Sequence, residues 1–342
     1  MRTDPSRLGY RMPAEWEEHE GTWISWPKDP DTFPGPILPK VEETFVNMIR
    51  ALGVGESVHV LVDDAKARVK VTELVGTGPD LVFHEIRTVD VWVRDYGPTY
   101  VKGRNLALVK WEFNAWGGKY DDLKPDNEAG EKLAASTGLT TFRPGLVLEG
   151  GSIDTNGEGS ILTTEQCLLN PNRNPSLGRR ELTAALEANL GATRVIWLGS
   201  GIEGDDTDGH VDDIARFVGP RTVMAGVEPD PFDRNHEPLG RNLAILSKAR
   251  DQAGHPLDIV EIPMPRRLDS SDGRLPASHL NFYIGNGAVL VPTFGGSSDG
   301  VALRAIEGAF SGREVVGIDC RALVYGLGTL HCVTQQIPKS PT

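Results

Sequence analysis

The sequence predicts an α/β fold in which five strand-helix-strand-strand units surround a central funnel. Apolar segments recur five times in the same order along the 342 residues, although the five units differ in sequence. Each unit has about 50–85 residues, a size typical of propeller blades and other repeat modules. Such units bury their faces against one another, so a ring of five would form a five-bladed α/β propeller with a funnel along its axis.

Each unit begins with an apolar strand that ends near glycine or proline. We expect these first strands at residues 21–26, 106–113, 160–169, 221–227 and 288–294. An amphipathic helix then follows in each unit, at residues 37–52, 125–137, 177–190, 239–253 and 299–310. In the first helix, apolar side chains recur at steps of three and four and predict one face against a sheet, namely Val41, Phe45, Met48, Ile49 and Leu52.

Two further strands complete each unit. The second strands are rich in Val and Ile, which is typical of buried strands, and span residues 57–62, 140–142, 194–198, 258–262 and 314–318. The third strands carry polar residues, at 89–94, 149–153, 210–217, 279–284 and 330–334. No Pro/Ser-rich linker separates the units. We therefore predict one domain over residues 1–342, with repeats at 12–95, 96–154, 155–217, 218–284 and 285–338.

Composition predicts a cytoplasmic protein, and its acidity is explained first by the need to keep such a protein soluble. Residues 1–10 lack the apolar segment of a signal peptide, and no stretch reaches the ~18 apolar residues of a membrane helix. Three cysteines are an odd and sparse set, which indicates reduced thiols. The net charge of −13 opposes binding to nucleic acid or anionic membranes and favours cationic small molecules.

Five reactive residues occupy comparable positions on the third strands, so the repeat directs them to a common centre. They are Asp95, Glu149, His210, Asp212 and Cys332. His210 and Asp212 are two residues apart, which would place both on one side of an extended strand. Each residue alone has an ordinary structural use, in a turn, a surface pair or a buried strand. Five of them at equivalent positions predict a site.

The five residue types suit substitution at a planar guanidinium. Two carboxylates, Asp95 and Asp212, could accept its four N–H groups in fork geometry. A thiolate at Cys332 could then attack the central carbon. His210 is the candidate acid and base, with Glu149 as its orienting partner. Hydrolysis of the adduct would release a ureido product.

Nine ordered motifs in this chain resemble those of the agmatine deiminase family, which is grouped with bacterial-type peptidylarginine deiminases. The motifs cover residues 12–17, 92–98, 113–118, 149–151, 170–175, 209–212, 275–278, 281–284 and 331–336. The resemblance implies the five-bladed propeller of guanidino-group-modifying enzymes and a homodimer as the usual assembly. It carries the family's catalytic set onto the same five residues and implies that no metal or organic cofactor is needed.

The resemblance implies hydrolysis of agmatine to N-carbamoylputrescine and ammonia in putrescine formation. Agmatine ends in an amine, so Trp92, Trp116 and Asp206 are expected to surround its cationic tail, with core packing an equal alternative for Trp116. The chain departs from the family at Leu327 and Thr329, where glycines are usual, and at Asp208, where asparagine is usual. The departure in the cysteine loop and the departure at Asp208 are both expected near the substrate tail. Peptidylarginine or another guanidine therefore remains an alternative substrate.

Other readings stay open at this point. An amidinotransferase would pass the same cysteine adduct to an amine, and a binding scaffold would catalyse nothing. A zinc site from His210, Asp212 and Cys332 has suitable ligand types but lacks the usual spacing. A calcium loop at 205–209 fails because Gly204 stands at a ligand position. Arg94 is expected to pair with a carboxylate, and two further thiols are expected to be buried and non-catalytic, Cys167 and Cys320.

Overall fold

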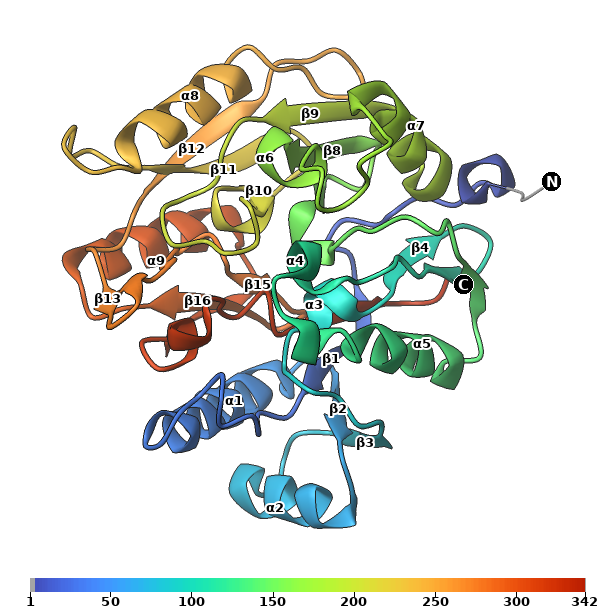
Figure 1. Cartoon of the computed structure of the whole chain (residues 1–342), viewed down its shortest axis with the longest axis vertical. Coiled ribbons are helices and arrows are strands. Elements are labelled where there is room, and N and C mark those ends of the chain that lie inside the picture. The colour runs from blue at the N-terminus through green and yellow to red at the C-terminus, as the bar shows by residue number, and fades with distance from the viewer. Residues whose placement is uncertain (1–3, 342) are drawn as a thin grey trace.

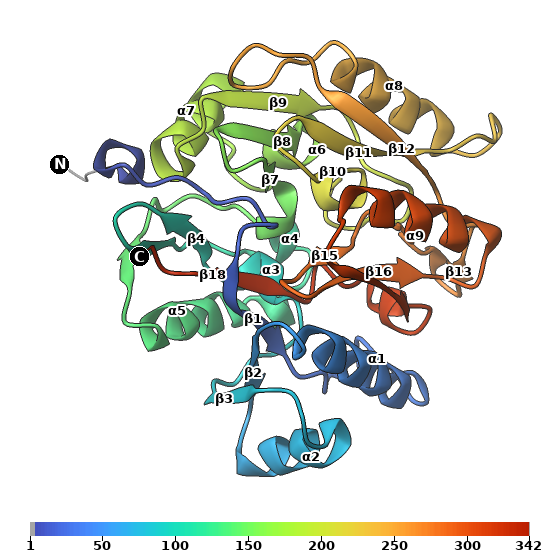
Figure 2. The same cartoon turned by 180° about the vertical axis from the view of Figure 1, so that it is seen from behind.

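The computed structural model describes residues 4–341 and shows a mixed α/β fold. Its sheets lie around a common centre, and its long helices lie toward the outside (Figures 1 and 2). None of the helices in residues 4–341 has the length and apolarity that crossing a membrane requires. The prediction that residues 1–10 hold no signal segment concerns a stretch whose first three residues lie outside this description.

Four three-stranded sheets share one topology, in which the middle strand pairs antiparallel with the preceding strand and parallel with the following one. The first two sheets comprise β4 (Thr99–Lys102), β5 (Leu106–Val109) and β6 (Thr140–Phe142), then β7 (Asp154–Thr155), β8 (Ser160–Thr164) and β9 (Arg194–Leu198). The other two comprise β10 (Ala215–Phe217), β11 (Thr222–Val227) and β12 (Asp258–Pro263), then β15 (Tyr283–Ile284), β16 (Ala288–Thr293) and β17 (Glu314–Asp319).

The remaining large sheet joins the two ends of the described chain. Its strand order is β18 (Gln335–Pro338), β1 (His19–Ser25), β2 (Ser57–Val62) and β3 (Leu81–Glu85). Strands β18 and β1 are antiparallel, with Trp23 opposite Gln335. This pairing gives the sheet the same arrangement as the others, with β3 as an additional strand. A small hairpin of β13 (Asp269–Ser270) and β14 (Gly273–Arg274) lies apart from them.

The long helices pack their apolar faces into the core, and three of them contact strands of two sheets each. They are α1 (Ile37–Leu52), α2 (Ala65–Val75), α5 (Asp126–Ser136), α7 (Arg179–Leu190), α8 (His236–Leu246) and α9 (Ser297–Ala309). Helix α1 contacts β16 and β17, α8 contacts β9 and β11, and α9 contacts β12 and β17. The apolar face predicted for the first helix is confirmed, because all five of its named side chains are buried.

The predicted starts of the third strands are too early in the sequence. The polar residues lie in short turns, and the strands begin after these turns. These turns include α3 (Val93–Tyr96) and the 3-10 turns η3 (Gly150–Ser152) and η4 (Val211–Asp213). Residues 330–333 also form a turn, and only then does β18 begin. Asp, Gly and Ser favour turns through side-chain bonds and permissive backbones. Each strand that follows such a turn pairs with the sheet of the next unit.

Several other predicted boundaries differ from the structure. The expected strand at 160–169 stops at Thr164, whose hydroxyl accepts from the Cys167 amide at 3.2 Å and starts the short helix α6 (Glu165–Leu168). The expected helix at 239–253 ends at Leu246, and the first strand at 106–113 ends at Val109. Helix α2 and strand β3 were not predicted. The remaining short elements are α4 (Ala115–Gly118), η1 (Pro5–Leu8), η2 (Asp121–Leu123) and η5 (Leu323–Gly326).

Candidate active site

The five predicted residues meet at the centre of the molecule, and all five are buried. Asp95 lies in α3, Glu149 precedes η3, and His210 and Asp212 lie at η4. Cys332 lies in the turn before β18. The His210 ring nitrogens lie 3.8 Å from Asp95 Oδ1 and 3.8 Å from Glu149 Oε2. Cys332 Sγ lies 3.9 Å from Asp212 Oδ2, so the turns bring all five together.

Gly151 allows these side chains to approach one another. Its backbone N–H donates to Asp95 Oδ1 at 2.9 Å. A Cβ atom at this position would lie 2.6 Å from His210 Nδ1 and 3.0 Å from both Asp212 Oδ2 and Asp95 Oδ1. The site therefore needs glycine at residue 151 because no side chain fits between these three groups.

The Cys332 thiol lies against an amide and several carboxylates. Asn281 Nδ2 donates to Sγ at 3.2 Å. Burial raises the pKa of the Cys332 thiol well above its ordinary value, and the charges of Asp212, Asp213 and Asp95 raise it further. The thiol is therefore protonated in the free protein. A cation bound beside it would oppose these carboxylate charges and favour the thiolate.

A buried chain of ion pairs supports the Asp212 carboxylate. His331 Nδ1 lies 2.6 Å from Asp212 Oδ2, and His331 Nε2 lies 2.8 Å from Glu15 Oε2. Glu15 in turn accepts from Arg216 Nη2 at 2.9 Å and pairs with Arg94 at 3.3 Å. The prediction that Arg94 pairs with a carboxylate is confirmed. Asp212 is thus held from behind through His331 and Glu15.

His210 carries the electrostatics of a general acid. Burial disfavours its charged form, but the Asp95 charge, Cys167 and Glu149 outweigh burial and raise its pKa well above the ordinary range. Neither ring nitrogen has a hydrogen-bond partner among the described residues. A protonated imidazole with free N–H groups is suited to donate a proton to a substrate atom.

A second set of contacts holds Glu149. Arg173 Nε donates to Glu149 Oε1 at 2.8 Å, and the Arg173 guanidinium also pairs with Asp208. Burial raises the pKa of Glu149, but the Arg173 and His210 charges outweigh it and lower that pKa overall. Asp208 was expected near the substrate tail. In the structure it pairs with Arg173, which also holds Glu149, and with Lys119, which contacts Asp206 of the cavity wall.

A cavity of about 350 Å³ opens onto Cys332 and Asp95. The three residues expected to surround a substrate tail, Trp92, Trp116 and Asp206, all line it. Trp116 Nε1 donates to Asp95 Oδ2 at 2.9 Å, so this tryptophan lies at the inner end of the cavity. Trp92 was predicted on a third strand, and its Nε1 donates to Asp90 Oδ2 at 2.8 Å. Its indole contributes an apolar wall of the cavity.

Leu327, which stands in the cysteine loop where the family usually has glycine, is part of the cavity wall. Leu327 lines the cavity and has a left-handed backbone with φ of 71°. Gly328 follows it, and a Cβ there would lie 2.5 Å from the Trp92 ring and 3.2 Å from Cys332 Cβ. Glycine at 328 therefore lets the loop pass between the indole and the nucleophile, whereas Leu327 adds an apolar side chain to the wall.

Sequence reasoning did not assign a role to four residues of this site. They are Glu15, Arg173, Asn281 and His331. All four lie in motifs that resemble the family, at 12–17, 170–175, 281–284 and 331–336. That resemblance was the available signal for them. The carboxylate-rich segment 205–209 forms a local turn, in which Asp205 accepts from the backbone of Thr207 and His210.

Comparison with known proteins places this site in a family. The chain matches the model of the Porphyromonas-type peptidyl-arginine deiminase family over residues 11–338. The chain belongs to this family. An agmatine deiminase of Stutzerimonas stutzeri is 37% identical over 366 residues, which cover 99% of this chain and 98% of that protein. A putative agmatine deiminase of Legionella pneumophila is 37% identical over 343 residues, covering 99% and 98%.

A solved deiminase of the same kind shares the fold. The agmatine deiminase of Enterococcus faecalis superposes with a TM-score of 0.92 at 32% identity and covers 98% of both chains. The likeness therefore extends over nearly the whole deiminase chain.

Proposed function

We propose that this protein is an agmatine deiminase, which hydrolyses agmatine to N-carbamoylputrescine and ammonia. The residues that line the cavity are the observation that supports agmatine as the substrate. Among the described residues that line it, seven are aspartates and none is Lys or Arg. A substrate with a carboxylate, such as free arginine, would need a cationic donor there, whereas the amine of agmatine needs acidic and aromatic groups.

The first half of the reaction forms a covalent adduct. Asp95 and Asp212 hold the guanidinium by its N–H groups, and its positive charge lowers the pKa of the Cys332 thiol. The thiol releases its proton to solvent, and the resulting thiolate attacks the guanidinium carbon and forms a C–S bond. His210 gives a proton to the departing nitrogen, the C–N bond breaks, and ammonia leaves with the bonding electron pair.

The second half of the reaction uses water. His210, now neutral, takes a proton from a water molecule whose oxygen attacks the amidino carbon. The C–S bond breaks and its electron pair returns to the sulfur, which takes up the hydroxyl proton of the adduct, so that the thiol is restored as the ureido product leaves. Glu149 acts as a positioning residue for His210, because its Oε2 faces the ring at 3.8 Å while Arg173 holds its other oxygen.

The tail of the substrate is assigned to the part of the cavity that extends away from Cys332. Trp92 and Trp116 supply aromatic faces, and Asp206 supplies a carboxylate at the wall. Asp206 already accepts from the Tyr120 hydroxyl, and its carboxylate lies 3.4 Å from Lys119 Nζ. Its contribution to binding the amine is therefore smaller than that of an unpaired carboxylate would be.

The larger architecture belongs to the same proposal. We propose that the chain is one domain whose five large sheets form the blades of an α/β propeller, with the cavity as its funnel. The common sheet topology and the closure of the first sheet by β18 support this arrangement. A homodimer in the cytoplasm that uses no cofactor completes the proposal.

The test measures ammonia and ureido product with agmatine, free arginine and a peptidyl arginine in parallel. Agmatine is expected to give the highest kcat/KM, and Cys332→Ala is expected to lower kcat by at least about 1000-fold. Cys320→Ala is the matched control, because that thiol is buried and does not line the cavity. A higher kcat/KM for the peptidyl arginine would show that agmatine is not the preferred substrate. Product formed only with an added amine acceptor would indicate an amidinotransferase. No ammonia from any guanidine would favour a binding scaffold.

A further inference from the structure

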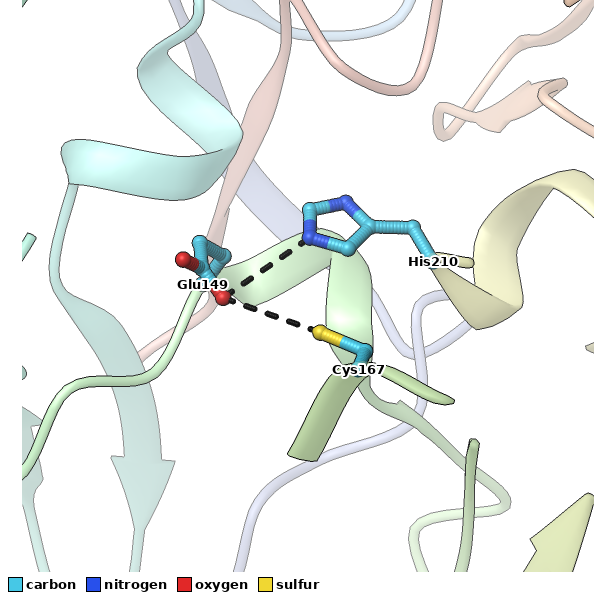
Figure 3. Close-up of side chains that lie close together, drawn as sticks. All are labelled: Glu149, Cys167 and His210. Atoms are coloured by element: carbon cyan, nitrogen blue, oxygen red, sulfur yellow. Dashed lines mark hydrogen bonds and ion pairs between the residues drawn. The ribbon is translucent and has the colours of Figure 1, made fainter. Parts of the chain in front are cut away.

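Three buried side chains that could ligate a metal meet behind the nucleophile. One carboxylate oxygen of Glu149, the Cys167 thiol and one ring nitrogen of His210 all lie within 4.8 Å of one another. Figure 3 shows the thiol and the imidazole directed at the same carboxylate oxygen. The proposed reaction assigns no bond-making or proton-transfer step to Cys167, which was expected to be a buried, non-catalytic thiol.

The ligand atoms in this cluster are only partly engaged. Arg173 occupies Glu149 Oε1, which leaves Oε2 facing the other two groups. His210 Nε2 lies 3.8 Å from Oε2, and Cys167 Sγ lies 3.9 Å from it. The imidazole is 1% exposed, and neither of its nitrogens has a hydrogen-bond partner among the described residues. A buried polar group without a partner is costly, so these nitrogens favour a ligand.

The donor set matches zinc and similar divalent ions. Zinc takes thiolate, imidazole and carboxylate ligands, and three protein ligands leave a fourth position open. Bond lengths of ~2.0–2.3 Å in a tetrahedral site place neighbouring ligand atoms about 3.3–3.6 Å apart. The separations of 3.8 and 3.9 Å from Glu149 Oε2, together with a third pair that lies within 4.8 Å, would contract to reach this range. We propose that Glu149, Cys167 and His210 form an inhibitory binding site for a zinc-class divalent cation.

The surrounding charges set the conditions for binding. Asp95 lies 3.8 Å from the other ring nitrogen of His210 and favours a bound cation, whereas the Arg173 guanidinium opposes it. The ion displaces protons from Cys167 and His210 when it binds. None of the three ligands lines the cavity, so loading requires a local opening and inhibition develops with time. The predicted inhibition rests on the proposed function, because the bound ion would remove His210 from proton transfer. The predicted binding of the ion does not rest on that function.

Cobalt(II) tests the binding site without any catalytic readout. The full chain is used as Cys332→Ser, so that the nucleophilic thiol cannot bind the ion. One Co²⁺ per chain with a thiolate-to-cobalt charge-transfer band is expected. The band should vanish in Cys167→Ser/Cys332→Ser and persist in the matched control Cys320→Ser/Cys332→Ser. A band that survives loss of Cys167, or the lack of stoichiometric uptake by folded protein, would overturn the proposal.

Zinc inhibition of the otherwise unaltered enzyme is the second arm. Zn²⁺ should inhibit agmatine hydrolysis progressively and a chelator should restore it. Cys167→Ser should retain turnover and need at least about tenfold more Zn²⁺, because even an indirect metal partner is worth 10–100-fold in affinity. Equal inhibition of both proteins would place the inhibitory ion elsewhere and overturn this assignment. If no protein turned over agmatine, the proposed function would fail while the cobalt result still decided the site.

Discussion

Gly151 lies where the Asp95, His210 and Asp212 side chains meet, and its backbone N–H is one of the groups that orient Asp95. This one position combines two requirements, a donor on the main chain and no side chain. The requirement becomes visible only when three turns from different sheets are placed together. Neighbouring residues that carry charge could be predicted from the sequence, whereas the need for glycine could not.

Gly151→Ala is expected to lower kcat by about 100-fold or more, because displacement of catalytic groups by about 1 Å costs that much. The added methyl would lie 2.6 Å from His210 Nδ1. Ammonia release gives the rate, and thermal melting shows whether the fold is kept. Gly240→Ala is the matched control in α8, since nothing lies within 4 Å of a Cβ there. Equal activity of the two variants would contradict the crowded geometry.

The reactive residues were predicted because each is a chemically distinctive type at a recurring position. Their partners could not be predicted in the same way. Glu15 and His331 bond to each other across 316 residues of sequence, and no local pattern marks such a contact. The two-residue spacing of His210 and Asp212 was interpreted as a strand. In the structure a 3-10 turn brings both residues to the site. The prediction that the two side chains face the same site is therefore correct, but the predicted strand is wrong.

At the scale of elements, long amphipathic helices and apolar strands were predictable, whereas short polar turns were not. The first helix is confirmed at residues 37–52 because its apolar stripe covers a full face. The turn at α3 spans four residues, too short for any periodicity to appear. Its position depends on a buried carboxylate in α5, since Asp126 accepts from the backbone of Val89 and Asp90 at the approach to α3.

The contact between α5 and this segment predicts a pH dependence of stability. Burial raises the pKa of Asp126 from 3.8 to about 7, with the bonds from Val89 and Asp90 opposing this rise. The folded protein then holds this proton more tightly than the unfolded chain. The contribution to stability is complete below the ordinary carboxyl pKa of 3.8 and is lost as pH rises toward about 7.

Urea unfolding of wild type and Asp126→Asn at several pH values between 4 and 8 measures this effect. Asparagine does not titrate, so the wild type should lose stability relative to the variant as pH rises, by an amount on the order of 3 kcal/mol. Asp90 is coupled to the same group, with a pKa raised by burial to about 6, and is expected to titrate in the same direction. A constant difference for Asp126→Asn would contradict the raised pKa.

At the scale of the whole molecule, the net charge of −13 and the aspartates of the cavity act in the same direction. Both draw a dicationic substrate toward Cys332 and both weaken as salt screens them. The net charge in the sequence predicted that the protein's electric field would attract cations. It did not show that the acidic residues gather around one cavity, because they come from segments as distant as Asp29 and Asp272.

Raising the salt concentration from about 0.02 to 0.3 M is expected to lower kcat/KM for agmatine severalfold, mainly through KM. Steady-state rates at several ionic strengths give the dependence. A butylguanidine, which lacks the tail amine, carries half the charge and should show a smaller decrease. Identical salt dependence for the two substrates would indicate that the cavity does not recognise the tail charge.

The pairing of β18 with β1 has a consequence for synthesis on the ribosome. Strand β1 emerges early, but its antiparallel neighbour spans residues 335–338, and Cys332 lies just before it. At translation rates of ~5–20 residues per second, β1 waits on the order of tens of seconds for this neighbour. During that interval its unpaired edge is open to other nascent chains or to chaperones. The nucleophile and the last strand thus arrive together, so the enzyme cannot act before β18 has paired with β1.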